Sequence, residues 1–198
     1  FLGTHNVYYV KMYLFVTLRA AVHSTSSPQV KKTDIPVTLT SKPRDHQSPG
    51  HPMTFLIYLL ACCAAGATGI IFKPGAWYQA LKKPAFTPPD WAFPVVWTTI
   101  YLLLAWAGYR LTLLPGSETL LALWAAQIAL NTLWTPVFFG AHRITAAMVI
   151  LAVLWIVVAV MVVMALQLDV VTGLILLPYL AWLSVAVALN FSILRHNK

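Results

Sequence analysis

Charged residues are scarce in this 198-residue chain. Only 9% of its residues are Asp, Glu, Lys or Arg, whereas about a quarter are charged in ordinary soluble domains. Hydrophobic residues make up 60%, and the mean hydropathy is +0.76. Apolar runs recur at close to the roughly 20 residues that a helix needs to cross a ~30 Å hydrocarbon core. The composition therefore excludes an ordinary soluble domain and predicts an integral membrane protein in contact with the lipid bilayer.

Acidic residues are rarer still, with five against thirteen Lys and Arg, so that the formal net charge is +8. Six of the thirteen basic residues precede residue 53. The others flank apolar segments, where Lys and Arg set membrane topology and anchor helices at the interface. The excess of positive charge therefore does not indicate nucleic-acid binding, and we expect no nucleic-acid partner.

Cysteines and catalytic motifs are also few. Cys62 and Cys63 are adjacent in an apolar run, which excludes a disulfide framework and does not make a metal site. The sequence has no G-x-S-x-G, H-E-x-x-H or Gly-rich phosphate loop. After Met53 the acidic residues lie only at segment ends, which argues against an ion-coupled transporter. We predict no metal site and no obligatory cofactor, and these patterns identify no catalytic residue.

Residues 1–52 differ from the rest of the chain, since much of this stretch is polar, aperiodic and rich in Ser, Thr and Pro, which is typical of disorder. The chain begins at Phe1, and Met53 opens the first uninterrupted hydrophobic segment. Three explanations stay open: an over-extended upstream translation, a basic targeting peptide, or a genuine tail. We favour the first, and assign the functional domain to residues 53–198.

Five membrane spans are predicted, at about 53–72, 93–114, 118–139, 144–168 and 170–194. The later connections are short, so consecutive helices should be antiparallel neighbours, and Ser117 is a suitable N-cap for the third span. The fourth span has almost no polar residue after Thr145 and is expected to face lipid. No β pattern is present. The predicted fold is an all-α integral membrane protein, a five-transmembrane-helix bundle.

The charges between the spans predict an orientation. The first loop, the third loop and the C-terminal segment sum to +5, whereas the opposite side sums to −1. By the positive-inside rule, loop 1 and the C-terminus should be cytoplasmic. If residues 1–52 are counted, four further positive charges fall on the opposite side and the bias weakens.

Three of the spans carry stripes that combine aromatic, polar and small residues at helical spacing. They are Trp97, Tyr101 and Gly108 in the second span, Trp124, Gln127, Asn131 and Trp134 in the third, and Tyr179, Trp182, Ala186 and Asn190 in the fifth. Such stripes can line an apolar pocket with a few polar groups, the usual composition of a small-molecule site. Two alternatives stay open, because Asn and Gln also join helices by hydrogen bonds and Trp often forms an interfacial belt.

The first loop holds the segment KKPAFTPPDWAFPVVW, residues 82–97. Its four prolines stiffen the backbone, and its large rings would be unfavourable in a solvated connector. We predict a lid that folds over the mouth of the bundle with its rings on a cavity, built from Phe86, Pro88, Pro89 and Trp91. The alternative is a membrane-surface anchor made of Trp and Lys.

The segments WYQALKKPAFTPPDWAFPVVWTTIY, AAQIALNTLWTPVFFG and LLPYLAWLSVAVALNFSILR resemble, in order and spacing, the signature segments of the TspO/translocator-protein family, formerly the peripheral-type benzodiazepine receptors. The resemblance covers residues 53 to about 195. It implies a five-helix bundle, usually a homodimer, that binds porphyrins such as protoporphyrin IX and haem, sterols, and synthetic hydrophobic ligands in a pocket beneath loop 1.

Carried over by position, the resemblance implies a ligand-binding set of Phe93, Trp97, Tyr101, Asn131, Trp134, Trp182, Ala186 and Asn190. It also implies dimer packing through small residues of the third span, here Ala122, Ala125, Ala126 and Ala129. Some family members are credited with light-dependent porphyrin breakdown, for which the corresponding residues are Trp97 and Trp182.

Two departures from the family pattern bear on the ligand. Ala85 and Phe86 stand where many relatives have Trp, so that the lid has less indole for stacking. Phe191 stands where the C-terminal cholesterol-recognition pattern has Tyr, which argues against cholesterol. The resulting hypothesis is a membrane receptor or carrier for tetrapyrroles. A porphyrin-degrading enzyme, a transporter and a scaffold without a ligand are the alternatives.

Overall fold

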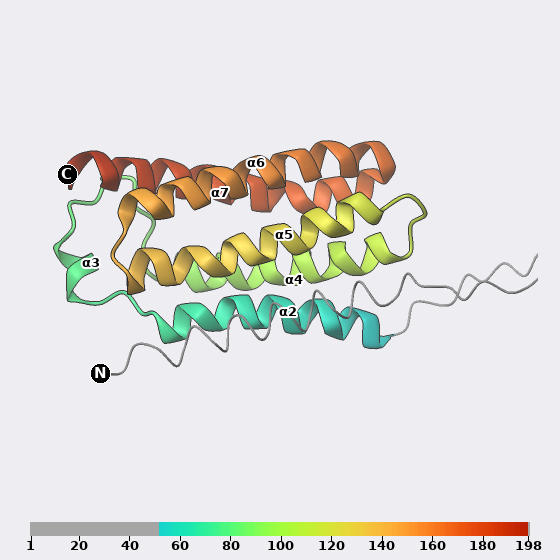
Figure 1. Cartoon of the computed structure of the whole chain (residues 1–198), viewed down its shortest axis with the longest axis horizontal. Coiled ribbons are helices and arrows are strands. Elements are labelled where there is room, and N and C mark those ends of the chain that lie inside the picture. Colours follow the sequence, from blue (N-terminus) through green and yellow to red (C-terminus); the bar gives the residue numbers. More distant parts are fainter. Residues whose placement is uncertain (1–51, 198) are drawn as a thin grey trace, which may run out of the picture. The chain divides into compact units, whose positions relative to one another are not determined.

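The computed structural model describes residues 52–197. Five long helices run alongside one another (Figure 1): α2 (Pro52–Ile71), α4 (Ala92–Thr112), α5 (Glu118–Thr135), α6 (Ile144–Leu168) and α7 (Val170–His196). Loop 1, residues 72–91, contains the short helix α3 (Ala76–Ala80), and α5 ends in a π-helical turn, η2 (Pro136–Gly140).

The prediction of an all-α bundle with five membrane spans is confirmed. Each long helix, with η2 counted as the end of α5, is long and apolar enough to cross a membrane. No strand occurs between residues 52 and 197. The helix ends lie within a residue or two of the expected ranges. The expectation for the N-terminal extension concerns residues that, apart from Pro52, lie outside the described part.

The helices pack mainly as sequence neighbours. The most extensive contacts are those of α6 with α7, of α5 with α6, and of α2 with α4. At the α2–α4 contact, a Cβ atom added to Gly108 would overlap the ring of Tyr58. This ring also packs edge-on against Trp124 of α5, with 4.7 Å between the ring centroids. Gly108 therefore sets how closely α2 can approach α4.

The prediction that the fourth span faces lipid is wrong for one side of α6. This helix has the largest buried share of the five, 33% of its membrane window, whereas α2 has only 11%. Leu151, Leu154 and Val158 form part of a buried face, while Val149 and Ile156 are exposed. A uniformly apolar helix gives no sequence signal for which side meets protein, because a protein core and lipid tails are both apolar.

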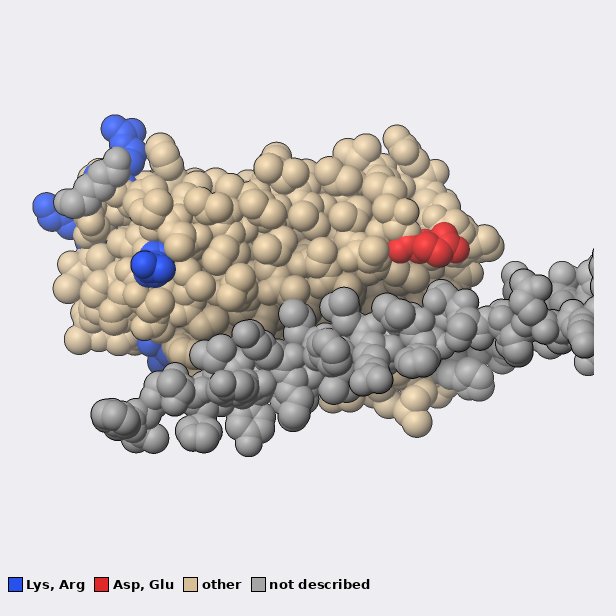
Figure 2. Space-filling view, in the orientation of Figure 1, with Lys and Arg blue, Asp and Glu red and all other residues tan. Residues whose placement is uncertain are grey.

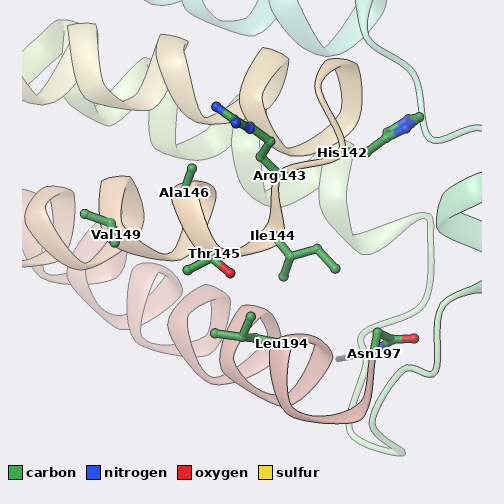
Figure 3. Close-up of a pocket in the computed structure, with 8 residues that line it drawn as sticks. All are labelled: His142, Arg143, Ile144, Thr145, Ala146, Val149, Leu194 and Asn197. Carbon is green, nitrogen blue, oxygen red and sulfur yellow. The ribbon is translucent and has the colours of Figure 1, made fainter.

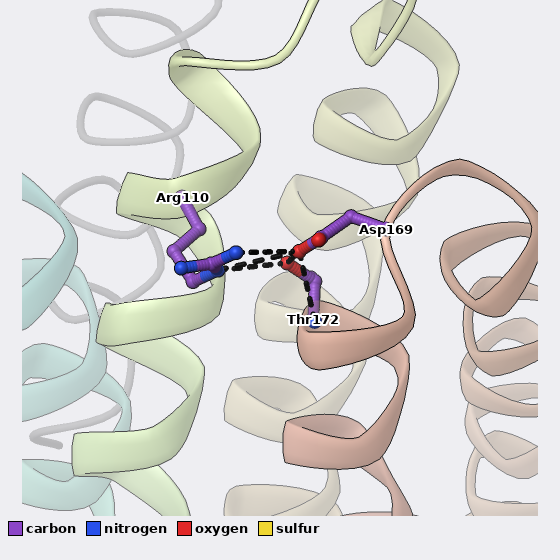
Figure 4. Close-up of polar contacts among 3 residues, drawn as sticks. All are labelled: Arg110, Asp169 and Thr172. Atoms are coloured by element: carbon purple, nitrogen blue, oxygen red, sulfur yellow. Dashed lines mark hydrogen bonds and ion pairs between the residues drawn. The ribbon is translucent and has the colours of Figure 1, made fainter.

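The end of the bundle away from loop 1 is closed by polar contacts (Figure 4). Asp169 lies between α6 and α7, and its Oδ2 atom accepts from Arg110 Nη2 of α4 at 2.9 Å and from the Thr172 backbone N–H at 3.0 Å. The Thr172 hydroxyl also donates to the same oxygen. These bonds, first that of the Thr172 hydroxyl and then that of Arg110, lower the pKa of Asp169 to about 2.

The α4–α5 turn lies at this same end. Ser117 occupies the N-cap position of α5, but its hydroxyl makes no capping bond and donates instead to the Leu111 carbonyl at 2.5 Å. The capping prediction is therefore wrong in its chemistry. Gly116 has φ +79°, a conformation that favours glycine, and it turns the chain back so that the Ser117 side chain reaches α4.

Charge is divided between the two ends of the bundle. On the face shown in Figure 2, Lys and Arg gather at the end that carries loop 1 and the C-terminus, and the visible acidic side chains lie at the other end. On the outside of α5, all four alanines of the small-residue ladder, Ala122, Ala125, Ala126 and Ala129, are exposed. They leave a smooth helix face on which another helix can pack closely.

Candidate functional site

A cavity of about 620 Å³ opens at the loop-1 end of the bundle, a volume within the range of small-molecule sites. All eight residues predicted to bind ligand line it: Phe93, Trp97 and Tyr101 from α4, Asn131 and Trp134 from α5, and Trp182, Ala186 and Asn190 from α7. The sequence stripes therefore converge on one space.

Aromatic rings from α4 and α7 form much of the wall. Trp97 lies with its ring centroid 5.4 Å from that of Tyr101 and 6.3 Å from that of Tyr179. Phe93 packs edge-on against Trp182, at 5.7 Å between centroids. Ring pairs at these spacings hold one another in place. The cavity thus has stiff aromatic walls that can stack on a flat hydrophobic ligand.

The turn η2 shapes the end of α5 beside the cavity. Pro136 has no N–H to donate, and the chain continues through a π turn in which the Ala141 N–H donates to the Pro136 carbonyl at 2.8 Å. Trp134 stacks on Phe138, with ring centroids 4.9 Å apart and an angle of 12° between the planes. Both side chains line the cavity. The sequence suggested a continuous third span and gave no sign of this turn.

The polar groups of the stripes fall into two classes. Gln127 is fully buried and does not line the cavity; its Oε1 atom accepts from the Tyr179 hydroxyl at 3.0 Å, and its Nε2 atom has no partner. Asn131 lines it and makes only a long contact, 3.4 Å, from its Nδ2 atom to the Tyr101 hydroxyl. Asn190 also lines it, and neither its Nδ2 nor its Oδ1 atom has a hydrogen-bond partner. Gln127 therefore joins α5 to α7, whereas the two asparagines lie in the cavity wall without a firm hydrogen bond to another helix.

Loop 1 covers the mouth of the cavity, but not with the predicted residues. Tyr78, Gln79, Thr87 and Asp90 line the cavity. Phe86, Pro88, Pro89 and Trp91 are absent from the lining, and Phe86 and Trp91 are 57% and 69% exposed. The prediction that these rings lie on the cavity is therefore wrong. In a membrane protein, exposed rings beside Lys82 and Lys83 match the alternative of an interfacial anchor.

Tyr78 is the ring that loop 1 does contribute. It packs against Phe139 of η2, at 5.3 Å between ring centroids. The Lys83 ammonium lies 4.2 Å from the centroid of the Tyr78 ring. Burial, together with the nearby Asp90 carboxylate, raises the pKa of Tyr78. Its hydroxyl therefore stays neutral at the cavity mouth.

Two contacts fasten the first half of loop 1 to the bundle. Trp77 stacks on His142 of the α5–α6 connection, with ring centroids 4.2 Å apart, and His142 has φ 56°. The Asn197 side chain accepts from the Lys82 N–H at 2.9 Å and donates to the Lys82 carbonyl at 3.1 Å. Sequence reasoning missed these lid contacts, because residues far apart in the chain make them.

A second groove, of about 590 Å³, lies where α6 begins and α7 ends (Figure 3). Arg143, Thr145 and Leu194 are among the side chains that line it. It is more open than the cavity, and His142 supplies its only ring among the described lining residues. The cavity beneath loop 1 is therefore the candidate ligand site.

Comparison with known proteins agrees with this arrangement. A profile of the TspO/MBR family matches residues 57–195, which includes all five long helices almost completely. This chain belongs to the TspO/MBR family. The prediction of family membership made from the loop 1, third-span and fifth-span motifs is thereby confirmed, and the protein is an integral, multi-pass membrane protein.

Relatives within the TspO/MBR family come from distant organisms. The chain is 49% identical over 147 residues to Protein CrtK of Rhodobacter capsulatus, covering 72% of this chain and 92% of the relative. It is 46% identical over 143 residues to the tryptophan-rich sensory protein of Cereibacter sphaeroides, covering 72% and 90%. It is 33% identical over 140 residues to the translocator protein of Homo sapiens, covering 68% and 83%.

Proposed function

We propose that this TspO/MBR family member is a membrane receptor or carrier that binds tetrapyrroles, such as protoporphyrin IX or haem, and other hydrophobic ligands in the cavity beneath loop 1. One observation carries the proposal: Trp97, Trp182 and Phe93 line a single space of about 620 Å³ that loop 1 covers. The relatives' names, sensory protein and translocator protein, support a role in sensing or translocation, which we propose concerns porphyrin sensing, trafficking or homeostasis.

The cavity favours binding of a tetrapyrrole through its aromatic ring over binding through ligation of a haem iron. Among the described lining residues there is no His, Cys or Met, and Tyr78 and Tyr101 are the only side chains of a type that ligates haem iron. A tetrapyrrole would be held by its large aromatic face, since stacking on aromatic side chains contributes about 1–3 kcal/mol per base-sized ring. Protoporphyrin IX is therefore the appropriate first probe.

The proposed membrane arrangement follows from charge and from small residues. Lys and Arg gather at the loop-1 end, which favours a cytoplasmic position for loop 1 and the C-terminus. The exposed alanine ladder on α5 supports a homodimer, because small residues let two helices approach closely.

A titration with protoporphyrin IX in detergent tests the ligand proposal, read by Soret absorbance. Trp97→Ala should weaken binding about 10- to 100-fold if the ring stacks there. Trp106→Ala is the matched control, since Trp106 lies on the same helix but is 45% exposed and does not line the cavity. Asn131→Ala should weaken binding several-fold without lowering the melting temperature.

Absence of saturable binding, or equal binding by Trp97→Ala and wild type, would overturn the proposal. Illumination of the same samples separates receptor from enzyme. Both Trp97 and Trp182 line the cavity, so Soret decay that requires either indole would favour porphyrin breakdown. Flux into liposomes would favour transport.

A further inference from the structure

Both residues that fasten loop 1 to the bundle also line the second groove, where α6 begins and α7 ends. His142 stacks on Trp77, with 4.2 Å between the ring centroids, and the Asn197 side chain makes two hydrogen bonds to the Lys82 backbone. His142 and Asn197 are both lining residues of this groove of about 590 Å³, and Figure 3 shows them at its end nearest to loop 1. A molecule bound in the groove would therefore lie against both fastenings of the loop.

The groove carries positive charge without a balancing acid. Arg143 lines it, whereas no Asp or Glu is among its described lining residues. Arg143 is exposed, and the one salt bridge within residues 52–197 joins Arg110 to Asp169, so that the Arg143 guanidinium has no carboxylate partner there. A guanidinium can meet a phosphate with two parallel hydrogen bonds. The groove thus suits an anionic group and offers no partner to an ammonium group.

Apolar side chains extend the groove from its charged end along α6. Ile144, Val149 and Leu194 line it, and Val149, which is 61% exposed, follows Ile144 by little more than one helical turn, about 7.5 Å along the axis. Both α6 and α7 are long and apolar enough to cross the membrane, and Lys and Arg gather at this end of the bundle. The groove therefore runs from the level of the lipid headgroups into the hydrocarbon. A phospholipid fills both parts, whereas a water-soluble phosphate leaves the apolar part uncovered.

We propose that this groove binds an anionic phospholipid and that the bound lipid keeps loop 1 fastened. The phosphate lies against Arg143 and the His142 ring, the Thr145 hydroxyl donates to a headgroup oxygen, and an acyl chain covers Val149 and Leu194. When loop 1 leaves the bundle, the His142 ring loses the stack that holds it in place, so that the lipid binds the fastened form more tightly. The site lies outside the cavity beneath loop 1, and its occupation needs no porphyrin.

Lipid retention tests the site itself. The protein is placed in nanodiscs of equal parts phosphatidylcholine and phosphatidylglycerol, and the lipids that remain bound after release are identified by native mass spectrometry. Wild type should retain phosphatidylglycerol in preference, and Arg143→Gln should reduce this preference about fivefold, the effect of one basic residue on an anionic lipid. Arg195→Gln is the matched control, since Arg195 is an exposed arginine at the end of α7 that does not line the groove. It should keep most of the preference.

Hydrogen exchange of the Lys82 amide tests the effect on loop 1, because this N–H donates to Asn197 Oδ1 and is protected only while the loop is fastened. In wild type, phosphatidylglycerol should slow this exchange about threefold relative to pure phosphatidylcholine, within the fivefold or so that one headgroup contact contributes. The slowing should vanish in Arg143→Gln and persist in Arg195→Gln. By reciprocity, Trp77→Ala, which removes the stack on His142, should weaken retention of phosphatidylglycerol by a similar factor.

Four results would overturn the inference. If wild type shows no preference for phosphatidylglycerol, or if both arginine variants lose it equally, the groove is not a lipid site and general surface charge accounts for any binding. Unchanged exchange of Lys82 on lipid binding would remove the link to loop 1. Equal slowing by inorganic phosphate in phosphatidylcholine nanodiscs would replace the lipid by a free anion. A clear fall in the melting temperature of Arg143→Gln in phosphatidylcholine would give Arg143 a structural role instead. Since no porphyrin is present, the proposed function stands or falls separately.

Discussion

The two ends of this bundle differ in how completely their polar side chains are paired. At the end away from loop 1, Asp169 pairs with Arg110 and Thr172, and Ser117 pairs with the Leu111 carbonyl. At the loop-1 end, Asn197 pairs with the Lys82 backbone, whereas the Asn190 carboxamide and the Trp134 indole N–H have no partner. Paired polar groups hold helices and loops in place. The comparison teaches that the same kinds of polar residue can fasten the bundle at one point and remain unpaired a few residues away.

The largest effect is expected at Gly108, where α2 and α4 approach closely in the half of the bundle away from loop 1. Gly108→Val places a side chain where the Tyr58 ring lies, so α2 must move away from α4. We expect a loss of about 3 kcal/mol, the upper part of the usual range for overpacking, measured as a fall in melting temperature in detergent. Gly69→Val is the control, since a Cβ there meets nothing within 4 Å, and an equal fall would contradict this account.

Removal of the Asp169 carboxylate should destabilise the closed end less. Asp169→Ala loses the cap on the Thr172 N–H and the pair with Arg110. The cap accounts for most of an expected loss of about 1–1.5 kcal/mol, because the ion pair is partly exposed to solvent and such pairs contribute little. Glu118→Ala removes an exposed acidic side chain from the first turn of α5 and should change the melting temperature much less.

The same carboxylate predicts a pH dependence. The pKa of Asp169 is lowered to about 2 in the folded protein, against roughly 3.9 for an unfolded Asp. Its contribution is therefore complete above pH about 4 and is lost as the pH falls from about 4 toward 2. Melting curves of wild type and Asp169→Asn should converge over this interval and stay apart, by a constant difference, from about pH 5 to 7.

At the cavity end, the hydrogen bonds of Asn197 to Lys82 can be broken without disturbing the core. Asn197→Ala removes both bonds to the Lys82 backbone, so that loop 1 should open more often. Trypsin should cut the Lys82–Lys83 bond about tenfold faster, as expected for the loss of two hydrogen bonds, with little change in melting temperature. His196→Ala, an exposed neighbour, should leave the cutting rate unchanged.

The smallest effect is expected at the exposed rings of loop 1. Trp91 is 69% exposed and lies outside the cavity lining, so Trp91→Ser should change protoporphyrin IX affinity by less than about twofold. Binding to liposomes of the isolated loop-1 peptide should fall instead, because Trp anchors at the interface. A large loss of porphyrin affinity would restore the lid role predicted for this ring.

The sequence predicts the features that depend on interactions within one helix, and it does not predict those that depend on contacts between distant segments. Apolar length alone placed the five helices, because each span must satisfy its own backbone hydrogen bonds in lipid. Helical spacing placed Trp97, Asn131 and Asn190 on inward faces, all of which line the cavity. Periodicity could not separate Gln127 from Asn190, although Gln127 accepts a hydrogen bond from Tyr179 of another helix and Asn190 lines the cavity instead.

The misses share a cause. Local rules predict that the prolines make loop 1 stiff. The direction in which its rings point depends instead on where the loop is fastened, through Trp77 to His142 and through Lys82 to Asn197. Likewise, α6 has no polar residue to mark its buried face. Contacts between distant segments and discrimination between lipid and core leave no local pattern in a sequence.

The contact of Asn197 with Lys82 also has a consequence for the order of assembly. These residues are 115 positions apart. At a synthesis rate of about 5–20 residues per second, on the order of ten seconds pass between the emergence of loop 1 and that of its partner. During this interval α4, α5, α6 and α7 enter the membrane while loop 1 is not yet fastened. The mouth of the cavity is thus among the last parts of the bundle to be set.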